Sequence, residues 1–175
     1  MPMSANSSIV QNAYVVKDLY QAIDKWSKLL NIGPFFINEN LTFDVVYRGQ
    51  PTVLQVSVAT VQSGGINIEL IQPLVDTPSV YADIYAHGAE GFHHICMVVD
   101  NYDEQVQRFC AQGHAIAMQA TMGDCRFCYI DTYNTLGCMT ELVENKSDIR
   151  ALYQHIREAA ETWDGHTDLI RPMQA

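Results

Sequence analysis

Residues 91–100 read Gly-Phe-His-His-Ile-Cys-Met-Val-Val-Asp, and this stretch decides the fold. Two histidines begin a short run of β-forming residues, which ends where a helix N-terminus is expected. A similar string at residues 9–18 reads Ile-Val-Gln-Asn-Ala-Tyr-Val-Val-Lys-Asp. When the strings are aligned, Gln11 falls on His94, 83 residues further along the chain. The alignment indicates an internal repeat with two metal-ligating residue types at equivalent positions.

Each copy of the repeat predicts a strand, a helix and three more strands. The helix after the first strand should begin at Asp18, with Gln21 completing a capping box, and Asn101 with Glu104 should act likewise in the second copy. Turn residues and β-prone runs then follow in both copies. Neither copy could bury both faces of a four-stranded sheet alone, so the two should share one core.

The segments outside the repeat are interpreted differently. Residues 1–8 are small and polar, and we expect a loose lead-in. Residues 145–175 are expected to form a helical extension, with an apolar stripe that ends at Trp163. This C-terminal helix should pack on the domain or on a second subunit.

The last strand of each copy carries a glutamate between apolar neighbours. Residues 66–71 align with residues 138–143, which places Glu69 over Glu141. A charged group in such a place is costly to bury unless it is paired or binds a metal ion. Gln11, Glu69, His94 and Glu141 therefore form one candidate site.

The motifs resemble those of the vicinal oxygen chelate superfamily, which includes glyoxalase I, methylmalonyl-CoA epimerase, bleomycin-resistance proteins and extradiol dioxygenases. The motifs are Gln-Asn-Ala-Tyr-Val-Val-Lys-Asp-Leu at 11–19, Ile-Glu-Leu-Ile-Gln-Pro at 68–73, His-His-Ile-Cys-Met-Val-Val-Asp at 93–100 and Thr-Glu-Leu-Val-Glu at 140–144.

The resemblance covers residues 9–144 and implies a single α+β domain. Its tandem βαβββ modules, at about 9–73 and 92–144, would form an eight-stranded open barrel followed by the C-terminal helix. The superfamily's metal-ligand positions fall on Gln11, Glu69, His94 and Glu141.

Two details of the site need comment: Gln11 departs from the epimerase pattern, and either His93 or His94 could be the ligand. The epimerases usually have His where this chain has Gln11, although Gln occurs there in one branch of glyoxalase I. Adjacent strand residues point to opposite faces, so His93 and His94 should not both enter the barrel. The alignment favours His94 as the ligand and would place His93 behind the sheet, against the helices.

One nitrogen and three oxygen donors suit a divalent ion such as Zn, Co, Ni, Mn or Mg. The ion would polarise a substrate carbonyl and stabilise the enolate formed when a neighbouring proton is removed, with Glu141 or Glu69 as the base. The first hypothesis is therefore a metal-dependent epimerase or isomerase acting on an acyl-CoA or on a bulky apolar carbonyl compound.

Two other functions compete with this one. A glyoxalase I-like lyase would need cations for the carboxylates of glutathione, and Arg48 and Arg126 are the nearest candidates. A metal-free small-molecule binding protein on the same fold is the third possibility.

Composition limits the partners and the compartment. A net charge of −10 with ten Lys and Arg argues against nucleic acid and anionic membranes as partners. No apolar run approaches a membrane span of about 20 residues, and the first residues lack signal-peptide features. Five cysteines, an odd number, favour a reduced cytoplasmic protein, with Cys125 and Cys128 structural because a zinc knuckle needs a second pair. By analogy with the family, we expect a homodimer.

Overall fold

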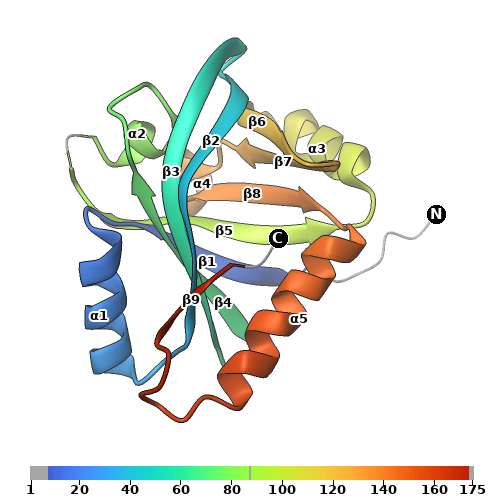
Figure 1. Cartoon of the computed structure of the whole chain (residues 1–175). Coiled ribbons are helices and arrows are strands. Elements are labelled where there is room, and N and C mark those ends of the chain that lie inside the picture. The colour runs from blue at the N-terminus through green and yellow to red at the C-terminus, as the bar shows by residue number, and fades with distance from the viewer. Residues whose placement is uncertain (1–7, 87, 174–175) are drawn as a thin grey trace.

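The computed structural model describes residues 8–86 and 88–173, so residues 1–7 of the expected lead-in lie outside the described residues. The first module contains β1 (Ile9–Val15), α1 (Leu19–Leu30), β2 (Phe35–Tyr47), β3 (Gln50–Ser63) and β4 (Ile66–Pro73). After α2 (Val80–Ile84), the second module contains β5 (Gly91–Val99), α3 (Tyr102–Ala111), β6 (Ile116–Met122), β7 (Cys125–Ile130), α4 (Tyr133–Leu136) and β8 (Met139–Glu144). The chain ends with α5 (Ser147–Glu161) and β9 (Ile170–Pro172), as Figure 1 shows.

The strands of both modules form one barrel, which confirms the predicted α+β fold and the repeat. Their order is β3-β4-β1-β5-β8-β7-β6-β2, and β2 also pairs with β3, so the eight strands close into a ring. The modules meet along β1 and β5, which are antiparallel. On the opposite side β2 and β6 are joined by two residue pairs, Val46 with Gln119 and Tyr47 with Met118.

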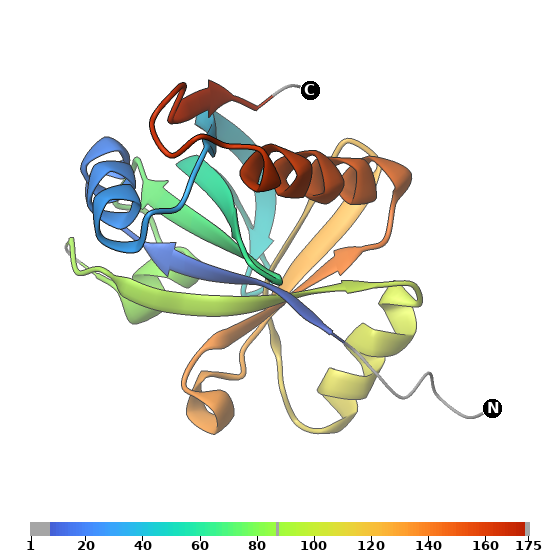
Figure 2. The same ribbon diagram turned by 90° about the horizontal axis from the view of Figure 1, so that it is seen from below.

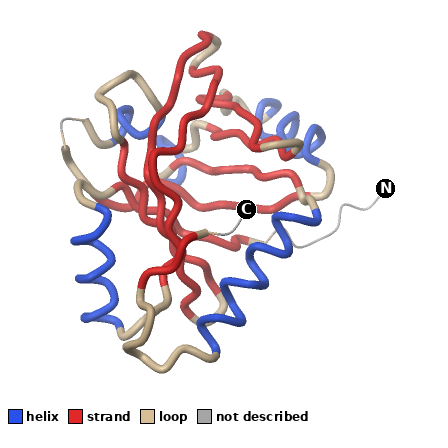
Figure 3. The backbone as a smooth tube through the Cα atoms, in the orientation of Figure 1, coloured by secondary structure: helices blue, strands red, loops and turns tan. Residues whose placement is uncertain are grey.

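Alternation along the strands separates an inner core from two outer ones. On β4, Ile68 and Leu70 pack outward against α1, while Ile71 belongs to the inner core. On β8, Leu142 packs outward with α3, and Met139 lies inside. Helices α1 and α3 therefore lie outside the strands of the sheet (Figure 3), and the side chains opposite to these outward ones face the barrel interior.

The C-terminal helix packs on the chain's own barrel. Helix α5 lies along one side of the barrel beside β9 (Figure 2). Its residue Ile149 joins a cluster with Cys96, Cys125 and Val143. Strand β9, which the sequence did not suggest, pairs in parallel with the start of β2. None of the described helices is long and apolar enough to cross a membrane.

The two expected helix caps differ. Asp18 accepts hydrogen bonds from the backbone nitrogen and the side-chain amide of Gln21, at 2.9 and 3.1 Å, which confirms Asp18 as the N-cap, although the Gln21 side chain bonds the Asp18 carboxylate and not its backbone N–H as a capping box requires. Asn101 makes no capping side-chain hydrogen bond, so the second expectation was wrong. The φ and ψ of Asn101 are −106° and 68°, outside the extended region that the cap of α1 adopts.

We predict that Asp18→Ala lowers the free energy of unfolding by about 1 kcal/mol, because two donors at the start of α1 lose their acceptor. Asn101→Ala is the matched control and should change stability by less than about 0.5 kcal/mol. Urea denaturation of the two variants measures the difference, and equal losses would contradict the assigned caps.

Candidate functional site

The structure brings together the four residues that the sequence singled out. Gln11 on β1 is opposite Cys96 on β5, and Cys96 is in turn beside Glu141 on β8. One row further along, Ala13 separates Glu69 on β4 from His94 on β5. Side chains in one row across a sheet share a face. Both modules therefore direct their polar residues into the barrel from either side of the β1–β5 pair.

The donor atoms of His94, Glu69 and Glu141 converge. Nε2 of His94 lies 3.4 Å from Oε2 of Glu141 and 3.8 Å from Oε2 of Glu69. His94 is fully buried, and its Nε2 has no hydrogen-bond partner. Donor atoms around one cation, with bonds near 2.1 Å, lie about 3 to 3.5 Å apart. Within the described residues, no three His, Cys, Asp or Glu side chains are yet arranged as a closed ligand cluster.

The second histidine determines which nitrogen of His94 bears a hydrogen. Nε2 of His93 lies 2.9 Å from the carbonyl oxygen of Val80, which can only accept, so this nitrogen carries a hydrogen. Burial, with the His94 ring beside it, lowers the pKa of His93 to about 3, so the ring is neutral and its Nδ1 accepts. The hydrogen in the 2.9 Å contact between the two Nδ1 atoms therefore belongs to His94. A neutral His94 ring then has its lone pair on Nε2, facing the carboxylates.

The expectation that His93 lies behind the sheet was wrong. Phe92 pairs with Tyr14 and His94 pairs with Ala13, so His93 is an extra residue in β5. Such a bulge breaks the alternation of side chains. The His93 ring consequently lies between His94 and α2, and it also contacts the ring of Tyr81.

The two carboxylates differ in charge. Burial, with the negative charge of Glu141 nearby, raises the pKa of Glu69 to about 8. Burial also acts against the charged form of Glu141, but the neighbouring His94, Cys96 and Tyr129 side chains lower its pKa overall. Without a cation, Glu69 is therefore mostly protonated at neutral pH and Glu141 is charged.

Two polar residues that were not predicted from the sequence, Asn67 and Thr60, lie beside Gln11 and Glu69. Nε2 of Gln11 donates to Oδ1 of Asn67 at 2.9 Å, which leaves Oε1 of Gln11 available as a ligand atom. Nδ2 of Asn67 and Oγ1 of Thr60 are buried without hydrogen-bond partners. Asn67 is opposite Gln11 and Thr60 is opposite Glu69 in the strand register, which could have identified them once the pairing was known.

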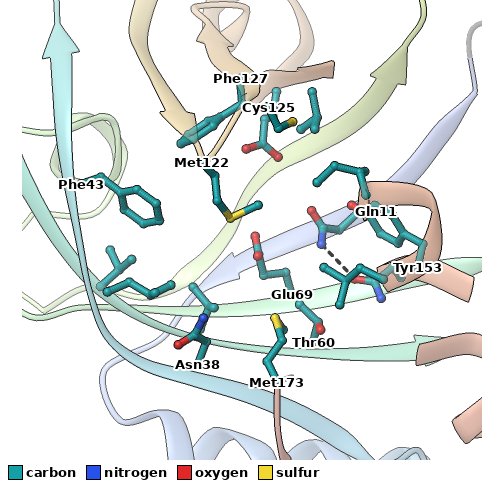
Figure 4. A pocket seen from close by; sticks show the side chains of 18 of the residues that line it. Gln11, Asn38, Phe43, Thr60, Glu69, Met122, Cys125, Phe127, Tyr153 and Met173 are labelled. Carbon is teal, nitrogen blue, oxygen red and sulfur yellow. Dashed lines mark hydrogen bonds between the residues drawn. The ribbon is translucent and has the colours of Figure 1, made fainter. Parts of the chain in front are cut away.

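A cavity of about 150 Å³ lies beside these residues. Figure 4 shows the side chains of Gln11 and Glu69 pointing into it, with Met122 reaching toward them. Most of the other walls are apolar side chains of β2, β3 and β7, and α5 lines the remaining side. Phe43, Met122, Phe127 and Tyr129 line the cavity, whereas Tyr47, Met118 and Met139 belong to the packed core around it.

The arginines that the sequence suggested for anion binding are engaged elsewhere. Arg48 forms ion pairs with Asp83 and Asp131 at 2.7 and 2.9 Å. Arg126 pairs with Asp103 and Glu144. Neither arginine lines the cavity.

The cysteines show no redox or knuckle arrangement in the described residues. All five are free. Cys125 joins the cluster beneath α5, whereas Cys128 packs outward in the α3 core. This agrees with a structural role.

Comparisons with known proteins agree with this architecture. Residues 10–129 match the family model described as the Glyoxalase/Bleomycin resistance protein/Dioxygenase superfamily. The structure is similar to methylmalonyl-CoA epimerase from Mycobacterium tuberculosis, with 19% identity, a TM-score of 0.60 and coverage of 86% of this chain and 97% of that one. A hypothetical protein from Bacillus halodurans gives 17% identity, a TM-score of 0.58 and coverage of 81% and 96%.

A third structure is similar to a comparable degree. It is methylmalonyl-CoA epimerase in complex with methylmalonyl-CoA and NH4+, with 18% identity, a TM-score of 0.57 and coverage of 81% of this chain and 96% of that one. At these identities the structural likeness shows the fold. No curated protein matches the sequence.

We predict that the metal-free protein loses stability as the pH rises from 4.5 to 8. The folded state holds the Glu69 proton more tightly than the unfolded chain, because its pKa is raised from 4.5 to about 8. The stabilisation is complete below pH 4.5 and is lost as the pH rises through 8. In the Glu69→Gln variant, the fall in the free energy of unfolding over this pH range should be smaller by about 2 kcal/mol.

Chemical denaturation in the presence of a chelator measures the effect. Glu161→Gln, which changes an exposed glutamate of α5, is the control and should follow the unmodified protein. A Glu69→Gln variant with an unchanged pH profile would show that Glu69 is ionised in the folded protein.

Proposed function

Because the chain belongs to the glyoxalase/bleomycin resistance protein/dioxygenase superfamily, we propose that it is a metal-dependent epimerase or isomerase that removes a proton next to a carbonyl group. One observation carries the proposal. Nε2 of His94 faces Glu69 and Glu141 without a hydrogen-bond partner. A divalent cation placed between these groups would attract the two carboxylates and the imidazole nitrogen together.

The residues present fit such a cation. Gln11 would bind it through Oε1, because Nε2 is already used by Asn67. Glu69, His94 and Glu141 would supply the other donors. One nitrogen and three oxygens suit Zn, Co, Ni, Mn or Mg. When bound, the ion would polarise a substrate carbonyl and favour the enolate.

The base is proposed among the carboxylates of the cavity. Glu69 and Glu141 are the acidic residues among its described lining residues. Burial raises the pKa values of the Tyr81, Tyr129 and Tyr153 phenols well above the ordinary range. These groups therefore stay protonated and cannot accept the substrate proton. Glu141, whose pKa is lowered, is the charged group at neutral pH and is the first choice.

The substrate is proposed to be a small carbonyl compound, either an acyl-CoA or a bulky apolar molecule. The acyl-CoA possibility is supported by the structural similarity to an epimerase that is described in complex with methylmalonyl-CoA. The apolar possibility is supported by the cavity walls, including Phe43, Leu54 and Phe127.

Two alternatives remain distinct proposals. The engagement of Arg48 and Arg126 in ion pairs weighs against a glyoxalase I-like lyase, whose glutathione adduct carries carboxylates.

A metal-free binding protein is the other alternative. It would be favoured if elemental analysis of the purified protein, after reconstitution with Zn²⁺, Co²⁺, Ni²⁺ or Mn²⁺, found less than about a tenth of an equivalent of metal. A structural site of this donor set is expected to fill close to one equivalent.

A cytoplasmic location and a homodimer complete the proposal. The free cysteines support a reducing compartment. The dimer rests on analogy with the family.

Glu141→Gln should abolish solvent-deuterium exchange at the substrate carbon, since the amide cannot accept the proton. We expect a loss of at least about a hundredfold for removal of a general base. Proton NMR in D2O with a panel of thioesters and ketones measures the exchange, and metal content is determined in the same samples. Glu144→Gln on the same strand is the control, because Arg126 already engages that carboxylate. Full exchange by a metal-loaded Glu141→Gln variant would refute the role.

His93→Phe should weaken metal binding by about ten- to a hundredfold, because His94 loses the acceptor that keeps the hydrogen on its Nδ1. Phenylalanine retains an aromatic ring against Tyr81 and Tyr129. Competition titration with a chromophoric chelator gives the Co²⁺ dissociation constant. His155→Phe on α5 serves as the control. An affinity within about twofold of the unmodified protein would contradict the assigned tautomer.

A further inference from the structure

Helix α5 encloses one side of the cavity. Ile149, Leu152, Tyr153 and Ile156 of this helix line the cavity, and Met173 after β9 joins them. Figure 4 shows Tyr153 and Met173 beside Gln11, Glu69 and Thr60. A ligand at the carboxylates must therefore fit beneath the C-terminal segment of the same chain.

The size and chemistry of the enclosed space restrict its ligand. A space of about 150 Å³ with apolar walls is the size that holds a benzene-like molecule. The described lining residues include Glu69 and Glu141 but no Lys or Arg. An anionic group buried there would face like charge without a compensating cation, which is costly.

The outer part of the cavity is also apolar. Met122 is 46% exposed, and Leu152 and Met173 are half-buried. The Arg126 guanidinium near the β6–β7 turn is held by Glu144 and Asp103. A ligand that extends outward from the cavity therefore passes methionine and leucine side chains, which favour an apolar tail over a phosphate.

Two buried donors are available for a ligand oxygen. Nδ2 of Asn67 and Oγ1 of Thr60 have no hydrogen-bond partners, and both residues line the cavity. The bond from Gln11 to Oδ1 of Asn67 fixes the amide so that Nδ2 is the free end. An unsatisfied buried donor is costly, and an oxygen of a ligand would remove that cost.

We infer that the substrate is an uncharged carbonyl compound with a compact apolar body, bound whole beneath α5, with an oxygen accepting from Thr60 and Asn67. The inference rests on the proposed function in taking a carbonyl as the reacting group. The inference favours the apolar carbonyl compound over the acyl-CoA, because the nucleotide portion of a coenzyme A thioester would add nothing to its binding affinity.

Binding of three probes to the full-length, metal-reconstituted protein tests the ligand class. The probes are acetophenone, benzoyl-N-acetylcysteamine and benzoyl-coenzyme A, which share the ring and the carbonyl group. Chemical-shift titration by NMR should show saturable binding of the two uncharged probes. The affinity of benzoyl-coenzyme A should be no higher than that of benzoyl-N-acetylcysteamine. A benzoyl-coenzyme A affinity more than about tenfold above that of the truncated thioester would overturn the inference, as would failure of acetophenone to bind.

Variants test the position of the ligand. Leu152→Trp fills the cavity from α5 and should reduce acetophenone affinity by at least about tenfold, whereas Ala151→Trp on the exposed side of the same helix should not. Thr60→Val should weaken binding about three- to tenfold, the value of one hydrogen bond, and Thr60→Ser should restore it. Circular dichroism checks that each variant is folded. Unchanged acetophenone affinity in a folded Leu152→Trp variant would overturn the placement under α5.

Failure here is distinguishable from failure of the proposed function. Acetophenone binding without any deuterium exchange would support the ligand class and count against the proton-transfer chemistry. Exchange that requires benzylic or aliphatic coenzyme A thioesters, with the matching ketones unbound, would support the chemistry and overturn the ligand class.

Discussion

Two glutamates and one buried imidazole nitrogen without a hydrogen-bond partner face one another inside the barrel, and the rest of the site depends on this arrangement. Burial favours neutral groups, yet the structure concentrates potential negative charge where solvent is scarce. In the absence of a cation, Glu69 accommodates the conflict by taking up a proton. The His93–His94 contact engages Nδ1 of His94 and leaves its Nε2 facing the carboxylates. These contacts support the proposal that the site holds a divalent cation.

Much of this could be predicted from the sequence, because it followed from pattern and duplication. The repeat predicted the paired βαβββ modules, and the alignment identified Gln11, Glu69, His94 and Glu141 as neighbours. Alternation puts Ile68 and Leu70 on the face of β4 opposite to Glu69, and in the structure both pack outward against α1. Such features depend on side-chain period and on internal repetition, which a single sequence displays directly.

The missed features depend on contacts between distant segments. A bulge at His93 inserts one residue into β5, and no local signal distinguishes it from a regular strand. Thr60 and Asn67 are ordinary strand residues until β3, β4 and β1 are paired. The apolar stripe of α5 predicted a buried face, but only the packed structure shows that part of that face lines the cavity. Local propensity could not supply this information.

The short β2–β6 pairing gives Arg48 a fixed structural duty. Two residue pairs join the modules there, and next to them Arg48 bridges Asp83 and Asp131 while its backbone nitrogen bonds to Ala117. Redirecting this guanidinium toward a ligand would break both ion pairs beside the shortest strand pairing of the barrel. A negatively charged substrate would therefore be served at lower cost by a basic residue other than Arg48.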